Sequence, residues 1–318
     1  MTSMNDPKSS TDVWSRWLLH VRNGGDAAFE QTLRLEVQQY VDRLLDDARI
    51  GPGMTLLDVG TGEGAVPFRA IERFGPGLRV VLTDISTPLL SRAQARAAEL
   101  GAQSQCQFIR CAADRLDGIE DGSVDVVTAR SALAYVSDKG AAFREFWRVL
   151  RPGGRISLAE PIFQDDAFHA CALKSLAEAD GGSPRDRLWP LLHRWKAAQF
   201  PDTPAGIAAN PLTNFSERTL FELTRAAGFS PIHLELHMDL SASPLPSWQT
   251  FLETSPHPLA PPLVDILDKQ FSDEERRLFE ATFRPLIESG RAMTVLRMAY
   301  LSATKSAVER SLATTAEC

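Results

Sequence analysis

Cysteine is scarce in this chain of 318 residues, and its cysteines do not form the pairs that disulfide frameworks or zinc sites need. They are Cys106, Cys111, Cys171 and Cys318, with no Cys-x-x-Cys pair, so we expect no disulfide framework and no metal site. Basic residues are in the minority: the net charge is −7, which argues against a general binder of nucleic acids or anionic membranes. Long apolar runs are missing too, and from the polar start MTSMNDPKSSTDVW we expect no signal peptide. We therefore expect a soluble, cytoplasmic protein.

Glycine is concentrated in the stretch LLDVGTGEGAV, residues 56–66. An apolar run passes through Asp58 into three glycines at every second position, Gly60, Gly62 and Gly64. Glycines let a ligand approach the main chain closely, and a helix that begins there offers unpaired N–H groups. A second acid, Asp84, follows the next apolar run, where it can accept hydrogen bonds from ribose hydroxyls. This spacing predicts a nucleoside cofactor at the carboxyl edge of a parallel sheet.

Short apolar runs alternate with helical patterns along most of the chain. The runs that read as strands are residues 54–59, 78–83, 108–112, 124–129, 155–159, 232–238 and 293–301. The intervening helical patterns are residues 65–74, 88–100, 141–150 and a helix that starts at Ser216. This rhythm predicts an α/β fold with a doubly wound, seven-stranded, mostly parallel sheet of Rossmann-like type and helical cap insertions.

The same patterns divide the chain. We expect disorder over residues 1–12, an N-terminal helical cap over 13–50 and a cofactor-binding core over 51–161. Residues 162–214 break the rhythm and are too long for an ordinary connection, which predicts a substrate-cap insertion. Residues 215–318 would complete the core with a helix and two strands, interrupted by a second helical insertion at 239–291.

Two nucleoside cofactors fit the glycine stretch. Because Ala65 fills the last position, the loop also satisfies the dinucleotide pattern of NAD(P)-binding oxidoreductases. Asp58, two residues before the first glycine, favours another cofactor, since it can meet a cationic amino group but would repel a pyrophosphate. Asp114, at the end of the segment CAAD, could accept a hydrogen bond from an adenine amino group.

With these residues the chain resembles the class I S-adenosylmethionine-dependent methyltransferases, especially small-molecule enzymes of the UbiE-like type. The segments that carry the likeness are LLDVGTGEG, VVLTDIS, CAADRL, SVDVVTARSALAYVSD, FWRVLRPGGRISLAEP and, further on, FSERTLFELTRAAGF. By this resemblance Asp58 would neighbour the methionine amino group, Asp84 would hold the ribose, and Arg130 would lie beside the methionine part. The full set of implied cofactor-binding residues is Asp58, Gly60, Thr61, Gly62, Gly64, Asp84, Ile85, Ala113, Asp114, Arg130 and Ser131.

The resemblance implies in-line transfer of a methyl group from S-adenosylmethionine. We expect the two insertions, helped by the N-terminal helix near Trp14 and Trp17, to close over the acceptor and form its pocket. Aromatic rings are dense there and suit a small apolar or aromatic molecule, although each could instead pack the core of the cap itself. The rings in question are Phe163, Phe168, His169, Trp189, His193, Trp195, Phe200, Phe215, Trp248, Phe251 and His257. A hydroxyl acceptor would need a general base. The candidates are His169, His193, Glu160 and Tyr135.

Other functions remain open at this level. They are an NAD(P)-binding oxidoreductase, a catalytically inactive subunit that binds S-adenosylmethionine, and an arsenite methyltransferase, for which only Cys171 lies in a suitable place. An amino-methylating DNA enzyme is not expected, because the segment 129–132 reads ARSA and lacks the tetrapeptide of that class. We expect a small-molecule acceptor, no nucleic-acid or membrane partner, and leave a homodimer open.

Overall fold

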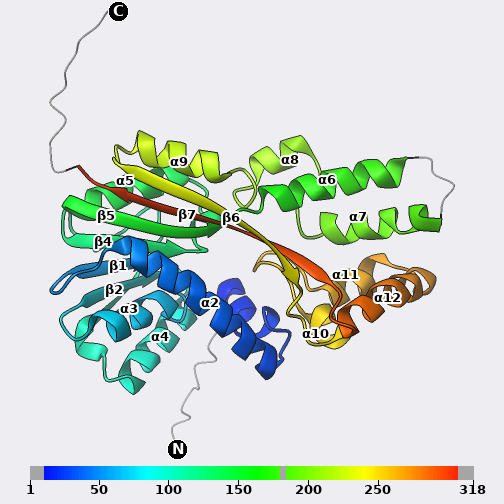
Figure 1. The fold of residues 1–318 in the computed structure, drawn as a ribbon, viewed down its shortest axis with the longest axis horizontal. Coiled ribbons are helices and arrows are strands. Elements are labelled where there is room, and N and C mark those ends of the chain that lie inside the picture. Colours follow the sequence, from blue (N-terminus) through cyan, green and yellow to red (C-terminus); the bar gives the residue numbers. More distant parts are fainter. Residues whose placement is uncertain (1–10, 180–183, 307–318) are drawn as a thin grey trace, which may run out of the picture.

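The computed structural model describes residues 11–179 and 184–306. Most of the segment 1–12 and Cys318 lie outside these ranges. Figure 1 shows an α/β core on one side of the molecule and a group of helices on the other, joined by two long strands. No helix within the described ranges is both long and apolar enough to cross a membrane.

The core is built on one sheet of seven strands in the order β3-β2-β1-β4-β5-β7-β6. All pairs are parallel except those of β7, which runs antiparallel to β5 and β6. The fold class predicted from the alternating pattern is therefore confirmed. The strands are β1 (Thr55–Val59), β2 (Arg79–Asp84), β3 (Cys106–Arg110), β4 (Val124–Arg130), β5 (Leu150–Pro161), β6 (Ile232–Ala242) and β7 (Met293–Thr304).

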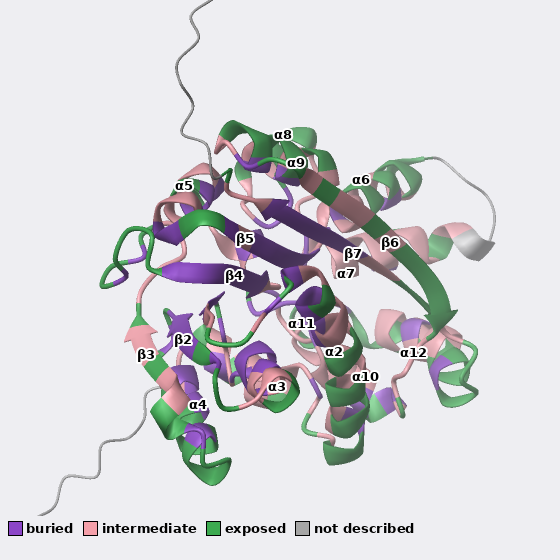
Figure 2. Ribbon diagram, turned by 60° about the vertical axis from the view of Figure 1, so that its left-hand side comes forward, coloured by how far each residue is buried: buried purple, intermediate pink, exposed green. Residues whose placement is uncertain are grey.

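The strand order reverses between β1 and β4, which places a crevice at their carboxyl ends. Both strands lie in the middle of the sheet and are almost wholly buried, as their apolar sequences require. Figure 2 shows this burial along β4 and β5, whereas the outer half of β6 is exposed. Any ligand of the glycine loop must therefore bind at this edge.

Helices cover both faces of the sheet. The helices α2 (Ala27–Ala48), α3 (Ala65–Phe74) and α4 (Thr87–Glu99) pack on one face, and α5 (Lys139–Val149) and α9 (Glu217–Ala226) pack on the other. The carboxyl half of α2 is part of the core, since Val41, Leu44, Leu45 and Ala48 are buried against the sheet. The region 13–50, expected to be a cap, therefore divides into a core helix and a shorter covering segment.

That covering segment is α1 (Val13–Arg16) followed by a π-helical turn, η1 (Trp17–Val21). The sequence predicted a helical region over residues 13–50. The structure breaks it at Gly24 and Gly25, which have φ angles of +59° and +72°, and Asp26 caps the start of α2. The break turns the first segment across the carboxyl edge of the sheet.

The two insertions form one helical body. It contains α6 (Gln164–Glu178), η4 (Pro184–Arg187), α7 (Trp189–Ala197), α8 (Pro204–Ala209), α10 (Trp248–Glu253), α11 (Leu263–Gln270) and α12 (Asp273–Glu288). Leu191 of the first insertion shares a hydrophobic core with Trp248, Ile266 and Phe279 of the second. The strands β6 and β7 reach this body because they pair with each other for five residues beyond the last pairing of β7 with β5, Pro161 with Met298.

Candidate functional site

The glycine loop takes a conformation that side chains would obstruct. Gly60 and Gly62 have φ angles of +69° and +56°, and Thr61 N donates to Thr83 O at 2.9 Å. A Cβ atom on Gly60 would lie 2.5 Å from Ala132 Cβ, so the loop and the turn after β4 pack at van der Waals distance only because the residue is glycine. Two short turns, one after β1 and one after β4, thus meet at the crevice.

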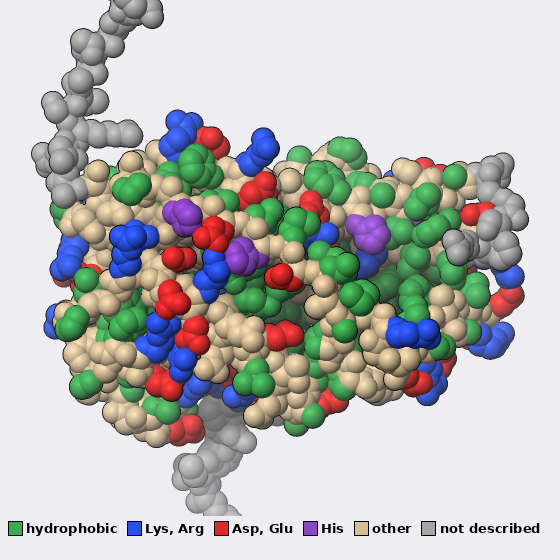
Figure 3. Space-filling view, viewed as in Figure 1, with side chains coloured by type: hydrophobic (Ala, Val, Ile, Leu, Met, Phe, Trp, Pro, Cys, Tyr) green, Lys and Arg blue, Asp and Glu red, His purple; other side chains and the backbone are tan. Residues whose placement is uncertain are grey.

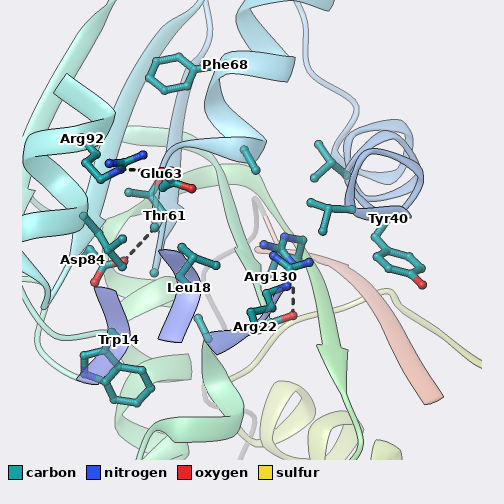
Figure 4. Close-up of a pocket in the computed structure, with 18 of the residues that line it drawn as sticks. Trp14, Leu18, Arg22, Tyr40, Thr61, Glu63, Phe68, Asp84, Arg92 and Arg130 are labelled. Atoms are coloured by element: carbon teal, nitrogen blue, oxygen red, sulfur yellow. Dashed lines mark hydrogen bonds and ion pairs between the residues drawn. The ribbon is translucent and has the colours of Figure 1, made fainter. Parts of the chain in front are cut away.

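A cavity of about 1440 Å³ lies over this loop. Figure 4 shows residues from the N-terminal segment, the glycine loop and the end of β4 converging on it, and Figure 3 shows the surface hollowed between the core and the helical body. The cavity brings together nine of the eleven residues predicted to bind a cofactor. They are Gly60, Thr61, Gly62, Asp84, Ile85, Ala113, Asp114, Arg130 and Ser131.

Asp84 ends β2 at the cavity wall. Its Oδ2 accepts a hydrogen bond from Gly62 N at 2.8 Å and its Oδ1 accepts one from Ser86 N at 2.9 Å, so it holds the glycine loop in place. Burial raises the pKa of this carboxyl. Each oxygen keeps a further lone pair for a hydroxyl ligand. Next to it Ile85 is 45 % exposed, an apolar surface that a flat ring could cover.

Asp58 and Gly64 are the two predicted residues that do not line the cavity. Asp58 is 2 % exposed beneath the loop, where its Oδ1 accepts a hydrogen bond from Thr128 Oγ1 at 2.7 Å. Burial raises the pKa of Asp58 to about 6. Gly64 begins α3 at a φ of +83°, and a Cβ there would lie 2.2 Å from the ring of Phe68. Because Gly64 has no side chain, it leaves room for the Phe68 ring.

The end of β4 is strained where it reaches the cavity. Ser131 has a φ of +52°, unusual for a residue with a side chain, and its N–H donates to Ala159 O at 2.9 Å. Arg130 Nη1 donates to Ser131 Oγ at 3.4 Å. Burial lowers the pKa of the Arg130 guanidinium. The turn thus presents a cation and a hydroxyl to the cavity.

Of the four candidates for a base, Tyr135 alone lines the cavity. Burial and the neighbouring Glu160 raise the pKa of the Tyr135 phenol, so it stays protonated at neutral pH. Glu160 is fully buried, and its oxygens accept from the backbone N–H groups of Ala132 and Ala134 at 3.1 and 3.3 Å. Burial raises its pKa to about 7. It orders the turn that carries Tyr135 and does not face the cavity.

The structure does not bring the two histidine candidates to the cavity. His169 lies on the exposed side of α6, because the opposite side of the helix packs on the protein through Ala167, Ala170 and Leu173. The Nε2 atom of His193 lies 2.8 Å from Asp202 Oδ2 within the helical body. His257, also considered as a ring for the pocket, is buried and its Nε2 atom contacts Gln199 O at 2.8 Å.

Most of the aromatic residues expected around an acceptor do not line the cavity. Trp195 lies edge-on to the rings of Phe251, Phe279 and Phe283, with centroids 5.6, 5.6 and 6.2 Å away. Phe200 and Phe215 are buried in the main core, and Phe168 is 52 % exposed. Phe163 is the one ring of that set that lines the cavity.

The N-terminal segment and α2 supply further cavity residues, of which the sequence had indicated only Trp14 and Trp17. They include Trp14, Trp17, Leu18, Arg22, Glu36 and Tyr40. The ring of Trp14 meets Tyr135 at 5.0 Å, and Trp17 Nε1 donates to Ser255 O of the second insertion at 3.1 Å. A Cβ on Gly62 would lie 3.3 Å from Leu18 Cδ2, so the segment covers the loop closely. For the other residues of this group the sequence showed only helical periodicity.

Comparison with known proteins agrees with this geometry. A family model for a methyltransferase domain matches residues 50–189. Nocamycin O-methyltransferase of Saccharothrix syringae is 37% identical over 211 residues, which are 65% of this chain and 71% of that protein. A tRNA 5-carboxymethoxyuridine methyltransferase of Escherichia coli is 36% identical over 170 residues, 53% of this chain and 61% of that protein.

Two further likenesses concern the cofactor core and the fold. The ubiquinone/menaquinone biosynthesis C-methyltransferase UbiE of Xanthomonas oryzae is 37% identical over 113 residues, 36% of this chain and 44% of that protein. The crystal structure of the YcgJ protein of Bacillus subtilis superposes with a TM-score of 0.53 at 18% identity, covering 84% of this chain and 98% of that one. That structure supports the fold alone. The matched methyltransferase domain and the similarity to nocamycin O-methyltransferase over 71% of its length show the family. The chain belongs to the class I S-adenosylmethionine-dependent methyltransferases of the UbiE-like type.

Proposed function

We propose that the protein transfers the methyl group of S-adenosylmethionine to a small, largely apolar organic molecule bound in the same cavity as the cofactor. The observation that carries this proposal is the continuity of the cavity. It joins the glycine loop to apolar walls formed by Trp14, Trp17, Phe163 and Met298. At about 1440 Å³ it exceeds the roughly 300–1,000 Å³ of a pocket for one drug-sized ligand, so it has room for two.

The residues of the crevice fit the cofactor part by part. Asp84 would accept hydrogen bonds from the ribose hydroxyls, and Ile85 and Ala113 would border the adenine, with Asp114 at its amino edge. Arg130 has no ion-pair partner within 4 Å among the described residues and would take the methionine carboxylate. In this orientation the guanidinium of Arg130 would pair with the carboxylate at one end of the cofactor, and Ile85 would contact the apolar face of the adenine at the other end.

When bound, the cofactor supplies an electrophilic methyl group: the acceptor's nucleophile forms a bond to the methyl carbon while the carbon–sulfur bond breaks and its electron pair stays on sulfur. The protein aligns the two molecules and excludes water. The N-terminal segment serves that purpose, because Leu18 covers Gly62 and Trp17 is hydrogen-bonded to Ser255 of the helical body.

Few of the described residues that line this cavity could act as a general base. No histidine is among the described residues that line it. Glu36 on α2 lines it, and burial raises the pKa of its carboxyl. Cys171 is not part of the lining, which gives an arsenite acceptor no support. The lining therefore favours an acceptor that is already nucleophilic at neutral pH over one that must first lose a proton.

The relatives differ in their acceptors, so their names do not decide the substrate. One is named for nocamycin and another for a modified uridine in tRNA. A net charge of −7 disfavours binding of a polyanion such as tRNA, and a cavity covered by the N-terminal segment suits a small molecule. We therefore place the acceptor among small organic molecules.

Calorimetry with S-adenosylhomocysteine and with NAD tests the cofactor. We expect saturable binding of the first and none of the second, with Asp84→Ala weakened and Arg16→Met, an exposed change in α1, unaffected. Turnover is then followed with a radiolabelled methyl donor and a screen of small acids, phenols, amines and thiols. Binding of NAD without binding of S-adenosylhomocysteine would show that the proposal is wrong.

A further inference from the structure

Two arginine side chains lie next to each other in the cavity. Arg22 directly follows η1, and Arg130 is the last residue of β4. Figure 4 shows their guanidinium groups side by side. Neither forms an ion pair within 4 Å in residues 11–179 or 184–306, and Arg130 is hydrogen-bonded to Ser131. Arg22 has no side-chain hydrogen bond in the same ranges; its guanidinium lies 5.9 Å from the ring of Trp17.

Such a pair is unfavourable in the absence of an anion. Burial first, and the neighbouring Arg130 second, lower the pKa of Arg22 to about 10. The nearby acids Glu36, Glu63 and Glu30 act on it only at longer range. Two adjacent, partly buried cations without a contacting carboxylate raise the free energy of the site, and an anion bound between them would lower it. The arrangement therefore indicates an anionic ligand.

The cofactor has one carboxylate, and the site has two guanidinium groups. Arg130 adjoins Ser131 at the strained end of β4, where the methionine part is expected, so it suits the cofactor carboxylate. Arg22 belongs instead to the segment that covers the cavity, on the side of Trp17 and Glu36. One cation thus remains for a second anion, and the acceptor is the molecule that shares the cavity.

Resting on the proposed function, we propose that the acceptor is a carboxylic acid whose carboxylate is held by Arg22 beside the methyl donor, and that the product is its methyl ester. A carboxylate oxygen forms the new bond to the methyl carbon, the carbon–sulfur bond breaks, and the electron pair stays on sulfur. No proton is transferred. An acid with a pKa of about 4 is ionised at neutral pH, so the absence of histidine from the described lining is no obstacle.

The test uses pairs of probes that differ only in charge. Aromatic and aliphatic acids, such as 2-naphthoic and dodecanoic acid, are titrated into the complex with S-adenosylhomocysteine beside their neutral amides. The variants are Arg22→Met, the charge-conserving Arg22→Lys and the control Arg16→Met, which makes the same chemical change at an exposed position of α1. Thermal unfolding of each variant reports whether it folds.

We expect acids to bind the parent complex more tightly than their amides, and Arg22→Met to weaken the acids at least tenfold. The same variant should change the amides and S-adenosylhomocysteine less than threefold, and Arg22→Lys should retain part of the preference. Labelled product should release volatile methanol in mild alkali, as methyl esters do. Equal binding of acids and amides by the parent would overturn the proposal.

A second outcome would also overturn it. If Arg22→Met weakens S-adenosylhomocysteine as strongly as Arg130→Met does, both guanidinium groups serve the cofactor. Should Arg22→Met fail to fold, the comparison of acid with amide in the parent and in Arg22→Lys still decides the question. Failure of the proposed function itself would look different, because the parent would then not bind S-adenosylhomocysteine at all.

Discussion

Replacement of Asp58 by Asn should remove a pH dependence from cofactor binding. Asp58 is 2 % exposed beneath the glycine loop, and burial raises its pKa to about 6. An ammonium group bound above the loop would stabilise the ionised carboxylate and lower that pKa. Below pH 6 the free protein therefore holds a proton that binding expels, so affinity should fall as the pH falls.

The magnitude follows from that pKa. At pH 5 about one tenth of Asp58 is ionised in the free protein, and at pH 7 about nine tenths of it is ionised. The dissociation constant for S-adenosylhomocysteine should then be about tenfold larger at pH 5, which corresponds to about 1.4 kcal/mol. In the Asn variant this dependence should disappear, because the amide does not titrate.

Isothermal titration calorimetry from pH 5 to pH 7 measures the effect, and buffers of different ionisation enthalpy count the protons released. The amino group of the ligand, an α-amine that ordinarily titrates at about pH 8, stays protonated over this range. Glu160, whose pKa is about 7, is present in both proteins and cancels in the comparison. Asn keeps an acceptor for Thr128 Oγ1, so the fold should persist. An identical pH profile in parent and variant would refute the reasoning.

Four further outcomes are expected, two for the site and two for the helical body. Asp84→Ala should weaken binding of S-adenosylhomocysteine by about 1–3 kcal/mol in calorimetry, since it removes a charged acceptor and frees the N–H of Gly62 that it holds at 2.8 Å. Gly62→Val should weaken it further, because a branched residue disfavours a φ of +56° and its Cβ would lie 3.3 Å from Leu18 Cδ2; unchanged affinity in a folded variant would contradict the site. Trp195→Ala should lower the free energy of unfolding by about 3–5 kcal/mol in denaturant titration, with little change in cofactor affinity, because Trp195 packs the helical body. His169→Ala should keep its turnover within twofold, since the exposed face of α6 is not part of the cavity; a large loss would return it to the reaction.

Local signals account for what the sequence predicted well. The glycine loop, the acid at the end of β2 and the helix Ala65–Phe74 depend on turn residues and periodicity within a few positions of each other. Strand alternation then determines the sheet, because parallel strands must share one carboxyl edge. Nine of the cofactor residues were brought together for that reason, although their contacts with ligand remain a prediction.

The features that the sequence did not predict depend on how distant segments of the chain pack together. Arg22 carries no motif, and it reaches the cavity because the chain turns at Gly24 and Gly25. Periodicity also cannot tell whether an aromatic ring faces a ligand or a neighbouring helix. Trp195 faces Phe279 of the second insertion, a contact between segments more than eighty residues apart in the sequence.

The strands β6 and β7 hold the two ends of the second insertion side by side. Ala242 pairs with Met293, and Ser243 N still donates to Ala292 O at 2.7 Å, so the two ends of the segment are already neighbours in a hairpin. A segment of different length or sequence could therefore join β6 and β7 without changing their register, provided that it still covers Leu191 and Trp195 of the first insertion. Because Pro256 and Pro258 of this segment line the cavity, its exchange would alter which acceptors can enter while leaving the glycine loop untouched. The range of acceptors that the protein accepts can thus evolve, or be engineered, through changes in the segment between β6 and β7.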